Sequence, residues 1–294
     1  MLRSVMLIVN PYSGRGLSKS ALGTIVEQLC KNGHATTVYV ADGDNTPERL
    51  VCEYAKHHDL VVCAGGDGTL NAVVSGVLHS GLSIPVGYIP AGTANDVAAT
   101  LALSRDPSAA VQKILEGRPR PIDIGLFDDR YFTYVAAFGA FTGVAYSTAQ
   151  SAKRALGHFA YILGGLAEVH AIKAIHTVVE YDGGVIEGDY IFCGVLNSTS
   201  VAGLVKIGRK HVDLTDGMFE VILVKRPVGL SDFLDILASI ATKKYDGDNV
   251  MLFHTSKVMF SLDSDAAWTL DGEDGGRHST AEIAVCREAI KIIY

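Results

Sequence analysis

The stretch DLVVCAGGDGTLNAVV, residues 59–74, decides how this chain begins to fold. Its first part, residues 59–64, is a short apolar run of the kind that forms a buried strand. Leu70, Val73 and Val74 then recur at helical spacing. The stretch therefore predicts a strand that ends in a glycine-rich turn and continues as a helix.

The turn within this stretch, Gly65-Gly66-Asp67-Gly68-Thr69, has the chemistry of a phosphate-binding loop. Glycines let backbone N–H groups approach a polyphosphate closely at the positive end of a helix. Asp67 cannot bind phosphate directly, because like charges repel, so it needs a metal ion between them or a different role. The structural alternative is that the glycines only serve a tight strand-to-helix turn.

The first 124 residues alternate between strand and helix patterns. Apolar runs typical of strands lie at 4–10, 35–41, 59–64 and 84–89. Patterns typical of helices lie at 17–32, 46–57, 69–80 and 106–116. Continuous apolar strands that alternate with amphipathic helices predict a parallel sheet covered on both faces, which is a doubly wound α/β domain.

Three polar or glycine-rich turns follow strands of this expected sheet. They are residues 10–14 (NPYSG), the turn at 65–69, and residues 90–96 (PAGTAND). Ligands of such sheets bind at the carboxyl ends of the strands. The sequence therefore predicts that the three turns converge on one ligand site.

The pattern changes near Asp123-Ile124-Gly125, where strands joined by tight turns begin. The expected strands are 131–138, 175–181, 186–197, 218–225, 257–262 and 281–286, and the expected helices are about 155–170 and 228–243. Asp182-Gly183-Gly184 is a plausible hairpin turn. These patterns predict a mainly antiparallel β-sandwich domain over 125–286. The α/β domain would cover 1–124, with residues of about 287–294 packed back onto it.

Composition excludes some classes of protein. The net charge of −7 argues against a nucleic-acid partner, which needs a basic surface. Contact with anionic lipid would have to use local patches such as Lys153-Arg154 or Lys206 with Arg209-Lys210. The five cysteines are dispersed, which fits a reducing cytosol, and Cys63 and Cys193 are expected in the core. The apolar part of the N-terminus is too short for a signal peptide, and no apolar run reaches the ~20 residues of a membrane span.

The three turns together resemble the diacylglycerol/lipid kinase family, which includes soluble bacterial diacylglycerol kinases and, more distantly, sphingosine and ceramide kinases. Their patterns are Asn10-Pro-x-Ser-Gly14, Gly65-Gly-Asp-Gly-Thr69 and Pro90-x-Gly-Thr-x-Asn-Asp96. The resemblance continues through Asp123-Ile-Gly125, Asp213-x-x-Asp-Gly217 and Asp271-Gly-Glu273, over nearly the whole chain. NAD kinases share the GGDG turn, but the third turn favours the lipid kinases.

The resemblance implies transfer of the γ-phosphoryl group of ATP to a lipid hydroxyl, with diacylglycerol converted to phosphatidic acid as the expected reaction. It implies a cytoplasmic protein that acts peripherally at the inner face of the membrane, on a lipid substrate. The residues expected to hold ATP are Asn10, Pro11, Ser13, Gly14, Gly65, Gly66, Gly68, Thr69, Asn71, Gly92, Thr93, Asn95 and Asp96. The oligomeric state is left open, with a homodimer among the expectations.

The resemblance also implies roles for the acidic residues. Asp67 would engage phosphate-bound Mg²⁺ through water, because Mg²⁺ keeps much of its hydration. Glu273 would accept the proton of the acceptor hydroxyl. A second magnesium site would use Asp213, Asp216 and the carbonyl of Met218. Asp123 would tie the two domains to the metal network.

Several of these segments have a structural alternative. Residues 93–96 also fit a capping box, with Thr93 as N-cap and Asp96 at the third helical position. The segments 213–217 and 271–276 could be an ordinary acidic turn and a polar hairpin. Where relatives carry a glutamate after Thr69-Leu-Asn, this chain has Ala72. If that glutamate only caps the helix, its loss costs about 1 kcal/mol.

Further departures from the family are Val40-Ala41, where relatives often carry a threonine, and Lys210, which replaces a proline. Two other functions stay open at this point. One is an NAD kinase-like or other small-molecule kinase that uses the same turn on a soluble acceptor. The other is a catalytically weak nucleotide sensor, which Ala72 motivates. Retention of Asp67, Asp216 and Glu273 argues against an inactive kinase.

Overall fold

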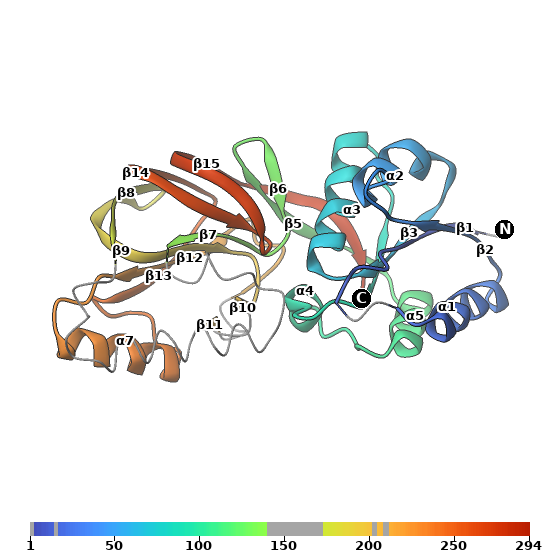
Figure 1. Ribbon diagram of the computed structural model, residues 1–294, viewed down its shortest axis with the longest axis horizontal. Helices are drawn as coiled ribbons and strands as arrows, with labels where there is room; N and C mark the ends of the chain where they lie inside the picture. Colours follow the sequence, from blue (N-terminus) through green and yellow to red (C-terminus); the bar gives the residue numbers. More distant parts are fainter. Residues whose placement is uncertain (1–2, 15–16, 140–172, 202–204, 208–211) are drawn as a thin grey trace. The chain divides into compact units, whose positions relative to one another are not determined.

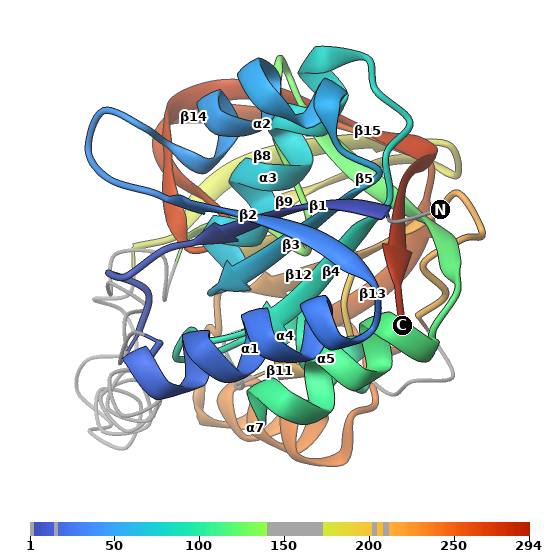
Figure 2. The same cartoon turned by 90° about the vertical axis from the view of Figure 1, so that its right-hand side faces the viewer.

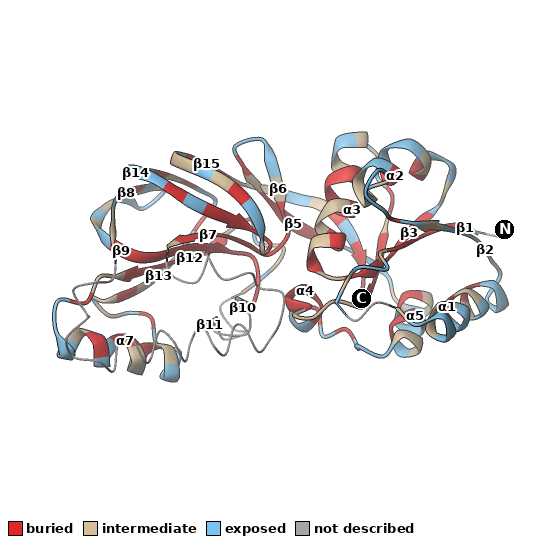
Figure 3. Ribbon diagram, viewed as in Figure 1, coloured by how far each residue is buried: buried red, intermediate tan, exposed pale blue. Residues whose placement is uncertain are grey.

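The structure is a computed structural model, which describes residues 3–14, 17–139, 173–201, 205–207 and 212–294 (Figure 1). The chain divides into two compact units. The first comprises Met1–Ile124 with Arg287–Tyr294, and the second comprises Gly125–Cys286. Each unit has a hydrophobic core of its own, and the residues buried in it lie mainly on the strands (Figure 3).

The first unit is built on a parallel sheet. Its strands follow the order β2 (His34–Val40), β1 (Arg3–Val9), β3 (Leu60–Gly65), β4 (Val86–Pro90) and the end of β15 (Glu273–Ile293). Each neighbouring pair in this order is parallel. Strand β3 is buried along its whole length, because helices cover the sheet on both faces. Strand β5 (Pro119–Phe127) pairs with β15.

Two pairs of helices cover the faces of this sheet (Figure 2). Helices α1 (Lys19–Lys31) and α5 (Pro107–Glu116) lie on one face, where Ile25 and Ile114 pack with Leu7 and Val62 in one core cluster. Helices α2 (Pro47–Tyr54) and α3 (Asp67–Ser80) lie on the other face, and the 3₁₀ turn η1 (Ala55–His57) extends α2. This arrangement confirms the predicted doubly wound α/β fold.

Capping residues in the local sequence specify where three helices start. The side chains of Ser18, Thr46 and Asp106 accept hydrogen bonds from the backbone N–H groups three residues later, at 3.1, 3.2 and 2.8 Å. Each satisfies a backbone donor that the first helical turn leaves without an intrahelical partner. These caps explain why the helical patterns gave the starts of α1, α2 and α5 within two residues.

The second unit is mainly antiparallel. Its main order is β13 (Val250–Thr255), β12 (Phe219–Lys225), β9 (Gly184–Leu196), β7 (Val135–Gly139), β14 (Lys257–Leu270) and β15. Strand β8 (Ile175–Tyr181) pairs with both β9 and β14. Each of these two long strands, β9 and β14, therefore pairs with β8 along one half of its length and with β7 along the other half. The smaller elements are β6 (Arg130–Phe132), β10 (Ser200–Val201), β11 (Val205–Lys206) and α7 (Leu230–Thr242).

Aromatic side chains fill the centre of the second unit. The rings of Phe127, Phe138 and Phe260 lie 4.9, 4.6 and 5.4 Å from that of Trp268, measured between centroids. Cys193 is buried in the same cluster, and Cys63 is buried in the first unit, as the sequence predicted. The unit confirms the predicted antiparallel β-sandwich class.

The structure corrects some predicted elements of this unit. The strand expected at 131–138 is interrupted at Thr133 and Tyr134, between β6 and β7. The strand expected at 281–286 is the middle of the much longer β15, and β5 and β13 were not predicted. The hairpin at Asp182-Gly183 is confirmed, since Tyr181 pairs with Gly184.

The helix expected at about 155–170 lies outside the described residues, as do Lys153-Arg154 and Arg209-Lys210. Among the described residues, no helix is long and apolar enough to cross a membrane.

Two glycines in helices of the first unit should respond oppositely to alanine. A Cβ on Gly76 of α3 would lie 2.8 Å from the Glu48 carbonyl oxygen and 2.8 Å from Val51 Cβ of α2, whereas a Cβ on Gly23 of α1 would meet nothing within 4 Å. We expect Gly76→Ala to lower the free energy of unfolding by about 1–3 kcal/mol through overpacking. Gly23→Ala should raise it by about 1 kcal/mol through helix propensity. Chemical denaturation measures both, and equal signs would contradict this packing of α2 on α3.

Candidate active site

Two of the predicted turns meet backbone to backbone in the first unit. A Cβ built on Gly92 would overlap the Cα of Gly66 and lie 2.8 Å from Asn95 Oδ1. The backbone N–H of Ala91 donates to the Gly65 carbonyl at 2.7 Å. The two turns therefore approach so closely that neither Gly66 nor Gly92 leaves room for a side chain.

The third turn, which follows β1, joins this pair through polar side chains. Asn10 Nδ2 donates to Thr69 Oγ1 at 3.0 Å, and Ser13 Oγ lies 2.8 Å from the same oxygen. Gly14 has φ +58°, and a Cβ on it would lie 2.9 Å from the Ala91 carbonyl oxygen. All three turns thus come together in one unit, at the carboxyl ends of β1, β3 and β4, as the strand pattern led us to expect.

All the residues predicted to hold a nucleotide lie in or beside these turns. Asn10, Pro11, Ser13 and Gly14 follow β1, Gly65 ends β3, Gly66 precedes α3, Gly68, Thr69 and Asn71 lie in α3, Gly92, Thr93 and Asn95 follow β4, and Asp96 begins α4 (Asp96–Thr100). Glycine backbone at the start of a helix can accommodate phosphate groups. The arrangement can therefore hold a polyphosphate, and each residue's contact with one remains a prediction.

The carboxylate of Asp67 links two of the turns. Its Oδ2 accepts the backbone N–H of Asp96 at 3.1 Å, and its Oδ1 accepts that of Val97 at 3.2 Å. Asp67 is 7% exposed and is the first residue of α3. It therefore caps the start of α4 from a different part of the chain, a role that the sequence did not indicate.

The predicted capping box at residues 93–96 is wrong. The N-cap of α4 is Asn95, in the left-handed region with φ 53°, and no side chain of its own segment caps the helix. Asn95 instead folds back on Gly92, donating from Nδ2 to the Gly92 carbonyl at 2.8 Å and accepting the Gly92 N–H at 2.9 Å. Tyr88 donates to the same Asn95 oxygen at 3.2 Å. These bonds fix the conformation of the turn that follows β4.

The capping explanation for Ala72 is also wrong. It assumed that helix α3 is capped by Thr69, which would put Ala72 at the third helical position. The helix begins at Asp67 with Gly66 as N-cap, so Thr69 lies in the first turn and Ala72 lies beyond it. A glutamate at this position could not cap α3, so the substitution by alanine does not remove a cap.

Asp123 is fully buried at the join of β5 with the end of the chain. Its Oδ1 accepts the backbone N–H of Glu288 at 2.7 Å, within the first unit. This bond fixes the last segment of β15 beside β5. A role for Asp123 in a metal network remains a prediction.

The acidic segment before β12 forms a turn. Asp213 Oδ1 accepts the N–H and hydroxyl of Thr215, at 3.0 and 2.8 Å, and Asp216 Oδ1 accepts the Met218 N–H at 2.9 Å. Both aspartates are exposed. Among the described residues, no three His, Cys, Asp or Glu side chains are grouped as metal ligands. The magnesium site at Asp213, Asp216 and Met218 therefore remains a prediction.

A buried carboxyl group that the sequence analysis missed lies on β12 close to this turn. The Glu220 side chain is 1% exposed and lies 3.8 Å from His254 Nε2. Burial, together with the smaller effect of the charges of Asp216 and Asp213, raises the pKa of Glu220 to about 8. The alternation of polar and apolar residues along β12 gave no signal for it, because both faces of this strand are buried.

Glu273 lies at the tip of the β14–β15 hairpin. Asp271 and Gly272 form its two-residue turn, with φ 52° and 83°, and Leu270 pairs with Glu273. Positive φ at both positions is the type I′ geometry that Asp-Gly favours. Glu273 is exposed, and its carbonyl accepts the hydroxyl of Thr269 at 3.0 Å. The polar-hairpin alternative is therefore correct for the backbone, and it leaves the Glu273 side chain available for chemistry.

Asp271, in contrast, is buried, with 4% of its surface exposed. Its Oδ2 accepts the N–H and hydroxyl of Thr133 at 2.6 and 2.7 Å, and its Oδ1 accepts the N–H groups of Tyr134 and Val135 at 2.9 and 3.0 Å. Burial raises the pKa of Asp271 to about 6, although these four hydrogen bonds lower it. The sequence showed the Asp-Gly turn but not this buried partner segment.

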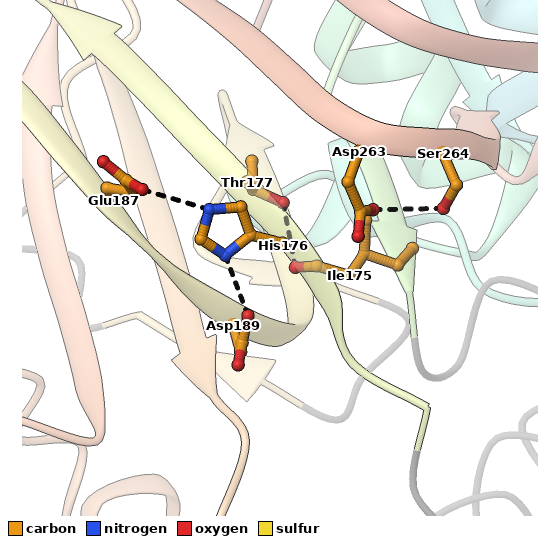
Figure 4. A network of polar contacts seen from close by, with 7 residues as sticks. All are labelled: Ile175, His176, Thr177, Glu187, Asp189, Asp263 and Ser264. Carbon is orange, nitrogen blue, oxygen red and sulfur yellow. Dashed lines mark hydrogen bonds and ion pairs between the residues drawn. The ribbon is translucent and has the colours of Figure 1, made fainter.

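One other cluster of titratable groups lies on the β8–β9 hairpin (Figure 4). The ring nitrogens of His176 lie 2.9 Å from Asp189 Oδ1 and 3.1 Å from Glu187 Oε1. The hydrogen bond to Asp189 raises the pKa of His176 most, and the hydrogen bond to Glu187 raises it by a smaller amount. Because both nitrogens already face carboxylates, the ring is arranged as a cation bridging two strand residues, not as a metal ligand.

Comparisons with known proteins agree with this architecture. Residues 4–127 match the family model of the diacylglycerol kinase catalytic domain, and residues 135–294 match that of the YegS C-terminal NAD kinase beta sandwich-like domain. Diacylglycerol kinases of Staphylococcus aureus strains JH9 and Newman are each 34% identical over 284 residues, covering 94% of this chain and 88% of theirs. A crystal structure of a diacylglycerol kinase from Bacillus anthracis strain Sterne has a TM-score of 0.77 at 20% identity, covering 99% of this chain and 97% of that one.

The chain belongs to the diacylglycerol kinase family. It is thus a kinase of the lipid-kinase type, an ATP-dependent phosphotransferase whose acceptor is a hydroxyl group. The resemblance drawn from the sequence motifs is confirmed.

The close approach of the two turns can be tested at Gly92. We expect Gly92→Ala to push the turns apart and to weaken ATP binding by about tenfold or more, because overpacking costs about 1–3 kcal/mol. Gly43→Ala is the matched control, since a Cβ there meets nothing within 4 Å. Titration calorimetry with ATP measures both, and wild-type affinity in Gly92→Ala would show that nucleotide binding does not depend on this contact.

The raised pKa of Asp271 predicts a pH dependence of stability. Because the folded-state pKa of about 6 lies above the ordinary 3.8, this group contributes stability that is fully present below about pH 4 and lost as pH rises through about 6. Asp271→Asn cannot titrate, so the unfolding free energy of the wild type minus that of the variant should fall by about 2 kcal/mol between pH 4 and 7. Chemical denaturation across this range measures the difference, which other titrating groups leave unchanged. A flat difference would contradict the raised pKa.

Proposed function

We propose that this protein is an ATP- and Mg²⁺-dependent diacylglycerol kinase, which converts diacylglycerol to phosphatidic acid at the inner face of the cytoplasmic membrane. The observation that carries the proposal is the convergence of three glycine-containing turns in the first unit, around Thr69, Gly66 and Gly92. The relatives named diacylglycerol kinase support the choice of acceptor.

The first unit would hold ATP. Backbone N–H groups of Gly66 and Gly68, at the start of α3, would face the phosphates, where the helix dipole favours negative charge. The hydroxyls of Ser13 and Thr69, already 2.8 Å apart, would donate to phosphate oxygens. The Asn95 side chain would keep the turn at Gly92 in place during binding.

Magnesium fits the surroundings of Asp67 as a partner reached through water. The Asp67 carboxylate lies at the start of α3, beside the turn that would hold the phosphates, and carboxylate oxygen is a ligand type that hydrated Mg²⁺ prefers. When bound, Mg²⁺ would neutralise charge on the transferring phosphoryl group. Asp67 would orient the water of such an ion while it fixes α4.

Glu273 would act as the proton acceptor. The acceptor hydroxyl oxygen would bond to the γ-phosphorus, the bond from that phosphorus to the β–γ bridging oxygen would break, and the hydroxyl proton would pass to Glu273. The Glu273 side chain is exposed, and its backbone carbonyl accepts the Thr269 hydroxyl at 3.0 Å, which suits this role.

A second candidate is a kinase that acts on a soluble acceptor, as NAD kinases do. The observation in its favour is the match of residues 135–294 to a sandwich domain described as NAD kinase-like. The two candidates differ in the acceptor, so parallel assays with diacylglycerol in vesicles and with NAD in solution separate them. Transfer to NAD without transfer to diacylglycerol would replace the first proposal by the second.

Replacement of the proposed proton acceptor should separate catalysis from ATP binding. We expect Glu273→Gln to lower kcat by about 10²–10⁴-fold, because general-base catalysis contributes that much. Its affinity for ATP should stay within about twofold of the wild type. The measurement is transfer of labelled phosphate from ATP to diacylglycerol in vesicles, with calorimetry for ATP binding.

Glu282→Gln is the matched control, because Glu282 is a partly exposed glutamate of the same strand, paired with Lys257 at 2.9 Å. It should retain wild-type kcat. ATP binding by the wild type with no transfer to any lipid would instead indicate a nucleotide sensor. Wild-type kcat in Glu273→Gln would remove Glu273 from the mechanism.

A further inference from the structure

We propose that Asp271 is a positioning residue for the phosphoryl transfer, which holds the hairpin tip that carries Glu273 against the segment 133–135. The inference rests on the proposed function, since it assigns Asp271 to the orientation of the proposed proton acceptor. Asp271, Glu273 and the segment 133–135 all lie in the second unit.

A two-residue hairpin turn is by itself a poor platform for an exposed catalytic side chain. Only Asp271 and Gly272 lie between β14 and β15, and Glu273 directly follows them. Residues on exposed turns move easily, whereas a proton acceptor must stay close to a productive geometry. Some other interaction must therefore fix this tip if Glu273 is to act as a base.

Asp271 supplies that interaction. Its carboxylate accepts three consecutive backbone N–H groups, those of Thr133, Tyr134 and Val135, together with the Thr133 hydroxyl. Consecutive N–H groups pointing at one anion form a compact anion site, which compensates the buried negative charge. The Asp271 N–H also donates to the Val135 carbonyl at 2.9 Å, so the tip and the segment are bonded in both directions.

The segment that receives Asp271 is itself fixed. Asn197, directly after β9, donates from its backbone N–H to the Tyr134 carbonyl at 3.0 Å and from Nδ2 to the Thr133 carbonyl at 3.3 Å. Thr133 and Asn197 are both buried. The Glu273 backbone is thus tied through Asp271 to two neighbouring strands of the sandwich, which explains why the chain interrupts the strand at 133–134.

The same unit provides an internal comparison. Asp182-Gly183 is a second two-residue Asp-Gly turn, and the Asp182 carboxylate also accepts local hydrogen bonds, from Ser256 N–H, Ser256 Oγ and Thr255 Oγ1 at 3.0, 2.9 and 3.0 Å. Asp182 is exposed, and no candidate catalytic residue follows its turn. A loss that is merely structural should therefore occur at either turn, whereas a loss of positioning should occur only at Asp271.

The experiment compares Asp271→Asn with Asp182→Asn at pH 7.5, in the full-length protein. An asparagine at 271 keeps the size of the side chain but replaces an acceptor oxygen by a donor that faces backbone N–H groups. We expect kcat for diacylglycerol phosphorylation to fall about 10–100-fold in Asp271→Asn, with KM for ATP within about twofold of the wild type. Asp182→Asn should lower Tm but leave kcat unchanged.

A milder pair of variants protects the test against a failure of Asp271→Asn to fold. Thr133→Val removes only the hydroxyl that donates to Asp271 Oδ2 at 2.7 Å, whereas Thr133→Ser retains it. We expect kcat to fall severalfold in Thr133→Val and to stay near the wild-type value in Thr133→Ser. Equal kcat in these two variants and the wild type would overturn the proposal.

Amide hydrogen exchange over residues 271–276 gives a readout that does not depend on activity. We expect faster exchange there in Asp271→Asn, because this substitution removes the hydrogen bonds that fix the tip of the β14–β15 hairpin. Asp182→Asn leaves those bonds in place and should not change exchange over these residues. Unchanged exchange, or wild-type kcat in Asp271→Asn, would overturn the positioning role. Wild-type protein that phosphorylates no lipid would overturn the proposed function instead, and the exchange data would still decide whether Asp271 fixes the tip.

Discussion

The backbone contact between Gly66 and Gly92 is the constraint on which the nucleotide side of this protein depends. Two turns from different strands can approach this closely only because neither carries a side chain at the contact. Once they touch, Asp67 reaches the start of α4 and Asn95 folds onto Gly92. The turns that follow β1, β3 and β4 are thus joined by hydrogen bonds from Asn10 and Ser13 to Thr69 and from the start of α4 to Asp67.

The two units use a common device. In each, a buried carboxylate accepts backbone N–H groups from a segment distant in sequence, Asp67 from α4 and Asp271 from residues 133–135. A short side chain with two acceptor oxygens can thereby fix a turn that has little packing of its own. The cost is the desolvation of a charge, which is visible at Asp271 as a raised pKa. In return, the buried carboxylate fixes the position of a neighbouring group, which matters where that group takes part in the reaction.

The fold class and many of the elements followed from local patterns. Valine-rich runs and helical periodicity located the strands and helices of the first unit within a few residues, and capping residues such as Ser18 and Asp106 fixed helix starts. The missed elements depend on contacts far along the chain. Helix α4 has only five residues and is capped by Asp67, and β15 runs over 21 residues because different segments pair with its two ends. No local window contains those partners.

The sequence by itself determined most strands and helices of the first unit, the three glycine-containing turns and the kinase family, because these depend on residue types at short, fixed spacings. Only the tertiary structure decided what each carboxylate does. Asp67 and Asp271 are bonded to backbone N–H groups 29 or 30 and 136–138 residues away, while Glu273 projects into solvent. The sequence shows that a carboxylate can accept hydrogen bonds, but it does not show from which donors. The role of the carboxylate depends on the donors that folding brings within about 3 Å of it.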